Sequence, residues 1–222
     1  MKWFSHAAFA IENGEHTVLV DPFFTGNPLC SIKPDELERV DAIVVTHGHR
    51  DHIGDTEYLA KKHDATVISS VEICNWLGKR GVKKLHGQQP GGGHSHFFGT
   101  VKFTAAVHSS SLPDGSYGGI AMGVILETGG KRIYHSGDTA LFSDMKIIGK
   151  NKLDAALLCI GGNYTMDVSE ALEAASMLKP GILIPMHYDT WEVIRQDVVS
   201  FKNKAASICD VRILGINDTI TI

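Results

Sequence analysis

The chain has 222 residues, of which 43% are hydrophobic and 21% charged, with a net charge of −4. This balance is typical of a globular protein and predicts a single compact domain over residues 1–222. The weakly acidic total gives no reason to expect nucleic acid as a partner, so a small-molecule substrate is expected instead. No apolar run reaches the ~20 residues that a membrane-spanning helix needs, so membrane insertion is not expected.

The cysteines are far apart in the chain and include no C-x-x-C pair. The residues after Met1 do not resemble a signal peptide. Both features predict a reduced, cytoplasmic protein whose thiols fill core positions. The oligomeric state stays open, with a homo-oligomer among the alternatives.

Strand and helix patterns alternate in the first half of the chain. Residues 3–12 and 16–20 flank Asn13-Gly14, a pair typical of hairpin turns, and predict two antiparallel strands. The β-α-β-α order that follows predicts a parallel sheet. Its predicted elements are a short helix at 34–39, a buried strand at 41–46, a helix at 55–63, a strand at 66–69, a helix at 71–79 and a strand at 82–85.

The second half begins with a glycine-rich loop at 88–94 and returns to alternation after three meander strands. Because each half mixes sheet and helix, we expect an α/β fold, a four-layer αββα sandwich with helices outside two facing sheets. The predicted strands are 101–107, 119–127, 132–135, 155–159, 182–185, 211–214 and 219–222, and the predicted helices are 168–178, with Asp167 as N-cap, and 192–205.

Histidine is unusually frequent, with 12 copies, and several of them cluster in the segment 47–52, directly after a predicted buried strand. The side chains of H-G-H-R-D-H can converge only on an irregular backbone, so Gly48 favours a loop over a helix here. Imidazole suits zinc, iron or nickel, and carboxylate often completes or bridges a second ion. The segment therefore predicts a two-metal site. A polar surface loop is the alternative, and four candidate ligands in six residues disfavour it.

The stretch T-H-G-H-R-D-H-I-G-D, from Thr46 to Asp55, resembles the H-x-H-x-D-H signature of the metallo-β-lactamase superfamily. The order of His108, Asp138 and His187 further along the chain agrees with that family. Within this family, the sequence motifs are similar to those of the branch that includes bacterial ascorbate-6-phosphate lactonase and many uncharacterised metal-dependent hydrolases. The marks of this branch are D-P-F at 21–23, A-V-H-S-S at 106–110 and G-G-N-Y-T-M at 161–166. Glyoxalase II-like members usually have Thr-x-Gly after the third histidine, whereas three serines follow here.

The resemblance implies a complete set of metal ligands. One divalent ion is held by His47, His49 and His108, a second by Asp51, His52 and His187, and Asp138 bridges the two. Zinc is the expected metal, with manganese, iron or nickel as alternatives. A hydroxide shared by the ions would attack the substrate. Taken alone, Asp138 could be a turn aspartate and His187 a core histidine, but both follow apolar strands, where sites of α/β folds gather.

Further candidates are weaker. Asp51 and His6 are candidate catalytic residues, His6 as a substrate contact or proton donor, although its place on a strand slightly favours a packed histidine. Asn163, with the two residues after it, follows a strand and is a candidate for orienting substrate. Asp21 either orients a ligand histidine or caps a turn. Arg50 either meets an anionic group or is a solvated charge.

A pair of histidines and one single histidine also have no assigned role. His94 and His96 form a rival metal pair, but the segment beside them is rich in glycine and lacks a nearby carboxylate. We expect a mobile loop there. The role of His135 is not determined by its sequence context.

The favoured function is hydrolysis of an ester-like bond, such as a lactone or phosphodiester. A di-iron redox enzyme is an alternative, but such members resemble H-x-E-x-D-H, where this chain has His49, and they carry a flavin-binding domain for which this length leaves no space. A non-catalytic metal or ligand sensor is a third hypothesis, and no ligand is missing to favour it. Nuclease action on long RNA is a weaker variant of hydrolysis.

Overall fold

Two β-sheets face each other in the computed structural model, which describes residues 1–222. The first sheet contains the N-terminal strands, and β1 to β3 are antiparallel whereas β3 to β6 are parallel. Its spatial order follows the chain: β1 (Lys2–Ser5), β2 (Ala8–Glu12), β3 (Thr17–Val20), β4 (Ala42–Val44), β5 (Thr66–Ser69) and β6 (Leu85–Gly87).

The second sheet combines a parallel half and an antiparallel half. Strands β10 to β13 run parallel, and β7 to β10 form an antiparallel meander. The spatial order is β13 (Asp210–Val211), β12 (Ile182–Met186), β11 (Ala155–Cys159), β10 (Lys131–His135), β9 (Met122–Thr128), β8 (Gly99–Ala105) and β7 (Gly93–His96).

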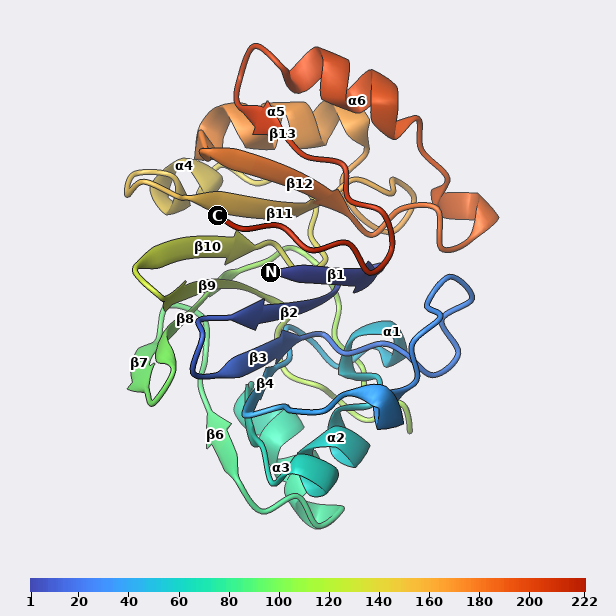
Figure 1. Ribbon diagram of the computed structural model, residues 1–222, viewed down its shortest axis with the longest axis vertical. Helices are drawn as coiled ribbons and strands as arrows, with labels where there is room; N and C mark the ends of the chain where they lie inside the picture. The colour runs from blue at the N-terminus through green and yellow to red at the C-terminus, as the bar shows by residue number, and fades with distance from the viewer.

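Helices cover both outer faces, so the predicted four-layer αββα sandwich is confirmed. Figure 1 shows α5 and α6 at the top, outside the second sheet, and α2 and α3 at the bottom, outside the first. None of the helices combines the length and apolar character that crossing a bilayer requires. Their bounds are α1 (Arg50–Ile53), α2 (Thr56–His63), α3 (Val71–Lys79), α4 (Met145–Ile148), α5 (Val168–Leu178) and α6 (Val198–Ala205).

Apolar side chains explain this layering. Every residue of β11, A-A-L-L-C, is buried, as expected for a strand covered on both faces. The larger core cluster includes Phe103 and Leu157 together with the inner face of α5. A smaller cluster, with Ile43 and Leu77, lies under α2 and α3. Each sheet thus buries one face against the other sheet and one against helices.

Several predicted boundaries were wrong. The stretch 3–12 is broken at Ser5 and His6, whose φ angles are 105° and 54°, so it forms two strands instead of one. The predicted helix 192–205 is a 3₁₀ turn (Glu192–Ile194) followed by α6, because the Asp197 side chain accepts a hydrogen bond from Ser200 N and begins a new helix. The predicted helix at 34–39 is a 3₁₀ turn over Pro34–Glu36.

Segments near the strand edges also differ from expectation. Part of the predicted loop 88–94 enters β7, which pairs with β8. The predicted strand 82–85 is displaced to β6, and 211–214 is reduced to β13. Residues 219–222 form no strand, because only Thr219 bridges to Lys2 despite the β-branched composition. Composition alone does not supply the partner that a strand needs.

Candidate metal centre

The candidate ligands come from the carboxyl ends of strands in both sheets. His47 follows β4, Asp138 follows β10, and His187 directly follows β12. His108 lies in the loop after β8. Parallel strands end at one edge of a sheet, and the two facing sheets bring these ends together. Residues separated by up to 140 positions (47 to 187) therefore meet at one point.

The H-x-H-x-D-H segment is partly helical, which corrects the prediction of a loop. His49 is the N-cap of α1, and Asp51 and His52 lie in its single turn. Gly48 is needed for space rather than for an unusual φ, since a Cβ there would lie 3.0 Å from Ser111 O. Gly54 ends α1 at φ 37°, where a Cβ would collide with the backbone of Pro22. A short helix between two glycines thus directs the ligands inward.

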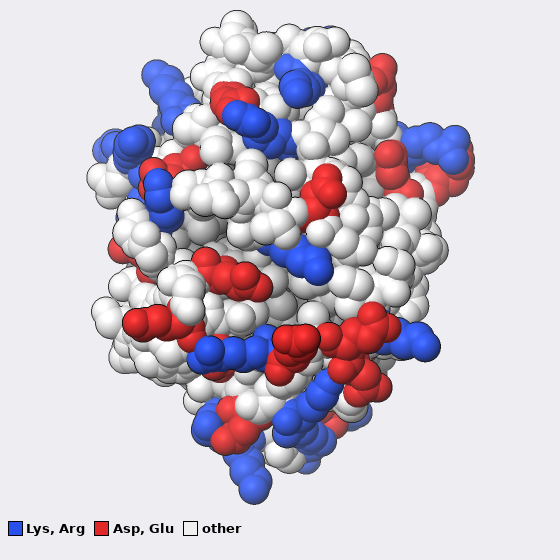
Figure 2. Space-filling model, in the orientation of Figure 1, with Lys and Arg blue, Asp and Glu red and all other residues white.

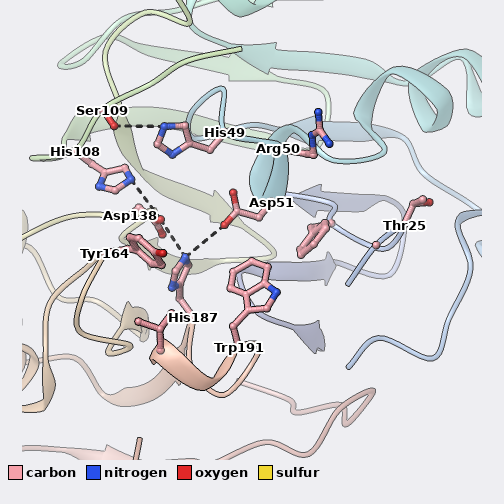
Figure 3. Close-up of a pocket in the computed structure, with 13 residues that line it drawn as sticks. Thr25, His49, Arg50, Asp51, His108, Ser109, Asp138, Tyr164, His187 and Trp191 are labelled. Carbon is pink, nitrogen blue, oxygen red and sulfur yellow. Dashed lines mark hydrogen bonds and ion pairs between the residues drawn. The ribbon is translucent and has the colours of Figure 1, made fainter. Parts of the chain in front are cut away.

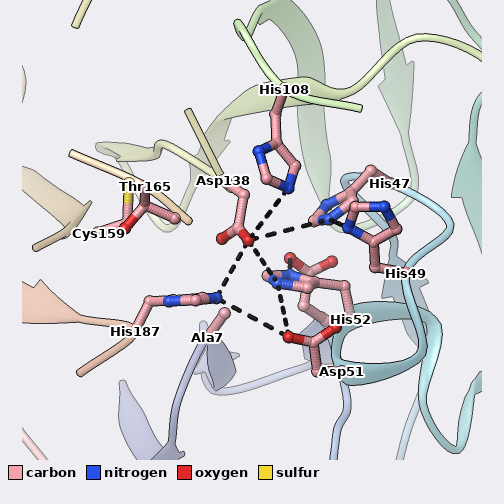
Figure 4. A network of polar contacts seen from close by, with 12 residues as sticks. Ala7, His47, His49, Asp51, His52, His108, Asp138, Cys159, Thr165 and His187 are labelled. Atoms are coloured by element: carbon pink, nitrogen blue, oxygen red, sulfur yellow. Dashed lines mark hydrogen bonds and ion pairs between the residues drawn. The ribbon is translucent and has the colours of Figure 1, made fainter. Parts of the chain in front are cut away.

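The Asp138 carboxylate lies at the centre of the cluster. Its Oδ2 is 3.0 Å from His187 Nε2, 3.3 Å from His52 Nε2, 3.6 Å from His108 Nε2 and 4.0 Å from His47 Nε2. Figure 4 shows these imidazoles arranged around it. One carboxylate oxygen is therefore within reach of histidines from both expected ligand sets.

Two sets of side chains have converging ligand atoms, and Asp138 joins them. His47, His49 and His108 form one set, in which one ring nitrogen from each side chain lies within 4.8 Å of the other two. A second set contains Asp51, His52 and His187 together with His6, and one ligand atom from each of these side chains also lies within 4.8 Å of the others. This division is the one that the sequence resemblance implies, with His6 added.

Buried polar atoms of the cluster have no hydrogen-bond partner. They are His52 Nε2, both ring nitrogens of His187, and Asp138 Oδ1. Asp138 Oδ2 lies close to His52 Nε2 and His187 Nε2, but the contacts do not have the geometry of hydrogen bonds. Burying such groups unsatisfied costs free energy, and a cation would satisfy them. The mixture of imidazole and carboxylate donors fits divalent transition metals.

A buried carboxylate orients one of these histidines. Asp21 is fully buried, and its Oδ2 lies 2.8 Å from His52 Nδ1. The same side chain accepts hydrogen bonds from Thr46 N at 2.8 Å and Thr46 Oγ1 at 2.6 Å. When a cation displaces the Nε2 proton, the proton held on Nδ1 by Asp21 leaves the lone pair of His52 on Nε2, the atom directed at the centre. Asp21 thus has the orienting geometry considered from the sequence, not that of a turn cap.

Burial and opposite charges shift the pKa values in the centre. Burial holds the pKa of His47 well below its ordinary value, so the ring is a neutral donor. Burial also opposes charge on His52, but the carboxylates of Asp138 and Asp21 outweigh it and raise its pKa. Burial would raise the pKa of Asp138, yet His187 and His52 hold it well below the usual range. Asp138 is therefore ionised at neutral pH, as a metal ligand must be.

The centre lies at the floor of a cavity of about 860 Å³. Figure 3 shows His49, Asp51, His108, Asp138 and His187 facing this space, with Tyr164 and Trp191 beside them and Arg50 farther out. Phe23 and Val193 add apolar surface to the wall. A cavity of this size, mostly apolar with polar groups at one end, suits a small molecule.

Sequence comparison identifies the family. The family model described as "Beta-lactamase superfamily domain" matches residues 16–188 of this chain. The chain belongs to the β-lactamase superfamily. It is also 45% identical to a UPF0173 metal-dependent hydrolase of Thermus thermophilus over 92% of this chain and 90% of the relative. The UPF0173 metal-dependent hydrolase of Carboxydothermus hydrogenoformans is 47% identical, covering 91% and 90%.

A solved structure in the superfamily agrees. Igni18, described as a novel metallo hydrolase from the hyperthermophilic archaeon Ignicoccus hospitalis, is similar with a TM-score of 0.89 and 35% identity. The match covers 98% of this chain and 95% of Igni18. The expected superfamily and fold are thereby confirmed, and the chain is placed among the metal-dependent hydrolases named UPF0173.

Not every residue that the sequence suggested as catalytic or substrate-binding lines the cavity. His6 is fully buried behind Asp51, so it is not positioned to contact substrate. Asn163 is exposed and does not line the cavity, whereas its neighbour Tyr164 does. His135 is a satisfied core histidine, since its Nε2 lies 3.0 Å from Ala7 O and its Nδ1 accepts from Gly137 N. Arg50 lines the cavity.

Sequence reasoning missed the apolar part of the cavity wall. Phe23 was noted only as part of the D-P-F motif, and no sequence pattern singled out Trp191 or Val193. Trp191 lies just before the predicted helix 192–205, and its side chain approaches His6, with ring centroids 5.1 Å apart. No local sequence signal distinguishes such a loop aromatic from a core residue.

Proposed function

We propose that this chain hydrolyses an ester-like bond of a small molecule, such as a lactone or phosphodiester, with two divalent cations at the centre. Zinc is the proposed metal, with manganese, iron or nickel as alternatives. The observation that supports this most strongly is the convergence of the donor set on the cavity floor. The proposed ligands are His47, His49, Asp51, His52, His108, Asp138 and His187.

Each ligand has a proposed place. His47, His49 and His108 would hold one cation, Asp51, His52 and His187 the other, and Asp138 would contact both. When bound, such a pair lowers the pKa of a shared water towards neutrality and polarises a carbonyl or phosphoryl oxygen. The protein need not provide a separate strong base, which accords with the absence of any other titratable side chain among the cavity-lining residues apart from Arg50 and Tyr164.

His6 is proposed as a positioning residue for Asp51. Its Nε2 lies 3.1 Å from Asp51 Oδ2, and its Nδ1 lies 2.8 Å from Thr190 Oγ1. Burial, with His187 close by, lowers the pKa of His6 to about 3, so the ring is neutral at physiological pH. If the neutral ring accepts a hydrogen bond from Thr190 Oγ1 at Nδ1, its proton lies on Nε2 and is donated to Asp51 in a second hydrogen bond. We therefore propose that His6 orients the Asp51 carboxylate, and not that it donates a proton to the substrate.

The cavity wall supports a substrate with an apolar part and a negative group. Phe23 and Trp191 offer aromatic surface, with ring centroids 6.2 Å apart. The guanidinium of Arg50 makes no ion pair or hydrogen bond within the protein and lines the same cavity. An Arg side chain in this state is available to a carboxylate or phosphate of the substrate.

The surface charge favours a small molecule over a nucleic acid. Figure 2 shows Lys and Arg interspersed with Asp and Glu on the visible face, without a continuous basic region.

The four cysteines are all unpaired, which supports action in a reducing compartment such as the cytoplasm.

A substrate panel tests the proposal. Protein reconstituted with two equivalents of zinc or manganese is assayed with lactones, thioesters and phosphodiesters, with and without an anionic group. We expect turnover of at least one ester-like class and its loss in Asp51→Ala. Asp64→Ala is the matched control, because Asp64 is an exposed carboxylate paired with Lys84. Two bound equivalents without any turnover across the panel would refute the hydrolase proposal and favour a binding role.

A further inference from the structure

A second cluster of imidazoles lies outside the cavity. His86 on β6 and His94 and His96 on β7 gather where the edge strand of the first sheet approaches the edge strand of the second. Their ring centroids are 4.3 Å apart for His86 and His94, 4.8 Å for His86 and His96, and 4.8 Å for His94 and His96. The sequence had indicated only the pair on β7.

Regular structure holds the cluster in place. Residues two apart on a strand project from the same face, so β7 presents His94 and His96 side by side. Strand β7 is paired with β8 along its whole length, from Gly93 with Lys102 to His96 with Gly99. His86 comes from the other sheet. The three rings are therefore presented by a paired strand and by β6, not by the mobile loop expected from the sequence.

The spacing of these rings is slightly shorter than that of the proposed ligands in the cavity. There the centroids of His47, His49 and His108 are 4.6, 5.2 and 5.1 Å apart. Three imidazoles on one tetrahedral zinc, with Zn–N of about 2.0–2.1 Å, need similar separations. The nitrogens of the second cluster do not all lie within 4.8 Å of one another, so binding requires a ring to rotate. Rotation of an imidazole about its Cβ–Cγ bond meets only broad, low barriers.

Neighbouring groups orient one of the rings. His96 stacks on Phe98, with an interplanar angle of 2° and centroids 5.4 Å apart. Its Nε2 lies 3.3 Å from Gln88 Oε1, and Gln88 is itself fixed by donating to Val101 O at 3.2 Å. A histidine that donates one ring proton to a fixed oxygen directs the lone pair of its other nitrogen elsewhere, which is the usual support of a metal ligand.

The protonation state also suits a ligand. Burial and the neighbouring imidazoles lower the pKa of His96 to about 4 and also lower that of His86. Both rings are therefore neutral at physiological pH and carry a free lone pair. His94 is exposed, so solvent reaches the cluster and can complete the coordination.

We infer that His86, His94 and His96 form a separate site for one divalent first-row transition metal, such as zinc, nickel or copper. Imidazole-only ligation suits these ions and not calcium or magnesium. Water fills the remaining positions. The bound ion joins β6 of the first sheet to β7 of the second, so its role is to clamp the two sheet edges.

Metal stoichiometry tests this inference. Chelator-treated full-length protein is titrated with zinc by calorimetry, and bound zinc is counted after dialysis. We expect His94→Ala/His96→Ala to bind one equivalent fewer than the wild type. His63→Ala is the matched control, because His63 has no neighbouring imidazole, and it should bind as much as the wild type. The result does not depend on the cavity, since the difference of one equivalent is expected whatever the cavity binds.

A second variant tests the clamp itself. In His86→Ala the two histidines of β7 remain, so a site confined to that strand would keep its affinity. We expect the affinity of this equivalent to fall by more than about tenfold, and the zinc-dependent rise in Tm to fall with it. Equal stoichiometry in the wild type and the double variant, or unchanged affinity in His86→Ala, would overturn the inference.

Discussion

Replacing Asp21 with Asn should impair metal binding although the side chain reaches no cavity. Asp21 Oδ2 accepts from both Thr46 Oγ1 and His52 Nδ1. An amide of the same shape can keep its oxygen towards Thr46 N and place its NH₂ where Oδ2 was. That group donates rather than accepts, so His52 Nδ1 must become an acceptor and carry its proton on Nε2 instead. The nitrogen directed at Asp138 then has no lone pair for a cation.

The expected magnitude follows from comparable orienting contacts. Loss of a carboxylate that orients a metal-bound histidine weakens metal affinity by about 10–100-fold, which is about 1.4–2.8 kcal/mol. The bond concerned is short, 2.8 Å, and fully buried, so solvent cannot replace it. The upper half of the range is therefore expected for the cation nearest His52, with little effect on the other.

Zinc titration of the chelator-treated protein measures this effect. Asp21→Asn should weaken one of the two equivalents bound at the cavity floor, leave the other and that of the His86, His94 and His96 cluster at wild-type affinity, and reduce hydrolysis. Asp41→Asn is the matched control, because Asp41 accepts from Thr17 N and pairs with Arg39 away from the cavity. Wild-type affinity for every equivalent in Asp21→Asn would refute the tautomer argument.

Three further predictions concern the rest of the chain. Gly54→Ala should lower the free energy of unfolding by about 1–3 kcal/mol, because φ there is 37° and a Cβ meets Pro22 O; an unchanged urea midpoint would contradict this. Iodoacetamide at pH 8 should label half-buried Cys30 before Cys159, whose burial raises its pKa to about 11, and mass spectrometry showing the reverse order would count against it. Burial and the neighbouring imidazoles lower the pKa of His96 from 6.5 to about 4. In metal-free protein the contribution of His96 to the free energy of unfolding is therefore complete above pH 6.5 and is lost as the pH falls towards 4. The urea midpoint of His96→Ala should accordingly fall less steeply over that interval than that of the wild type; parallel curves would exclude the effect.

The sequence predicted elements well where burial and capping both act locally. Strand β11 was predicted at its observed bounds because a continuous apolar run marks a strand covered on both faces. Helix α5 was equally clear, since Asp167 caps it and Glu170 completes a capping box. The gathering of His47, Asp138 and His187 was also predictable, because each follows a strand.

Other features depend on tertiary contacts that spacing does not encode. The tight turn at Ser5 and His6 lies within an apparently continuous strand pattern, and it is this turn that carries His6 behind Asp51. Trp191 becomes cavity wall only through the path of a loop. His86 belongs to a different sheet from His94, so their proximity follows from the packing of two sheet edges and from no periodicity in the chain.

Anomalous diffraction at the zinc edge, from crystals of zinc-loaded protein, tests the central claim most directly. At the cavity floor we predict two strong peaks about 3.5–4 Å apart, one beside His47, His49 and His108, the other beside Asp51, His52 and His187, with Asp138 contacting both. No peak at the cavity floor, or a single peak out of reach of Asp138, would contradict the proposed binuclear centre.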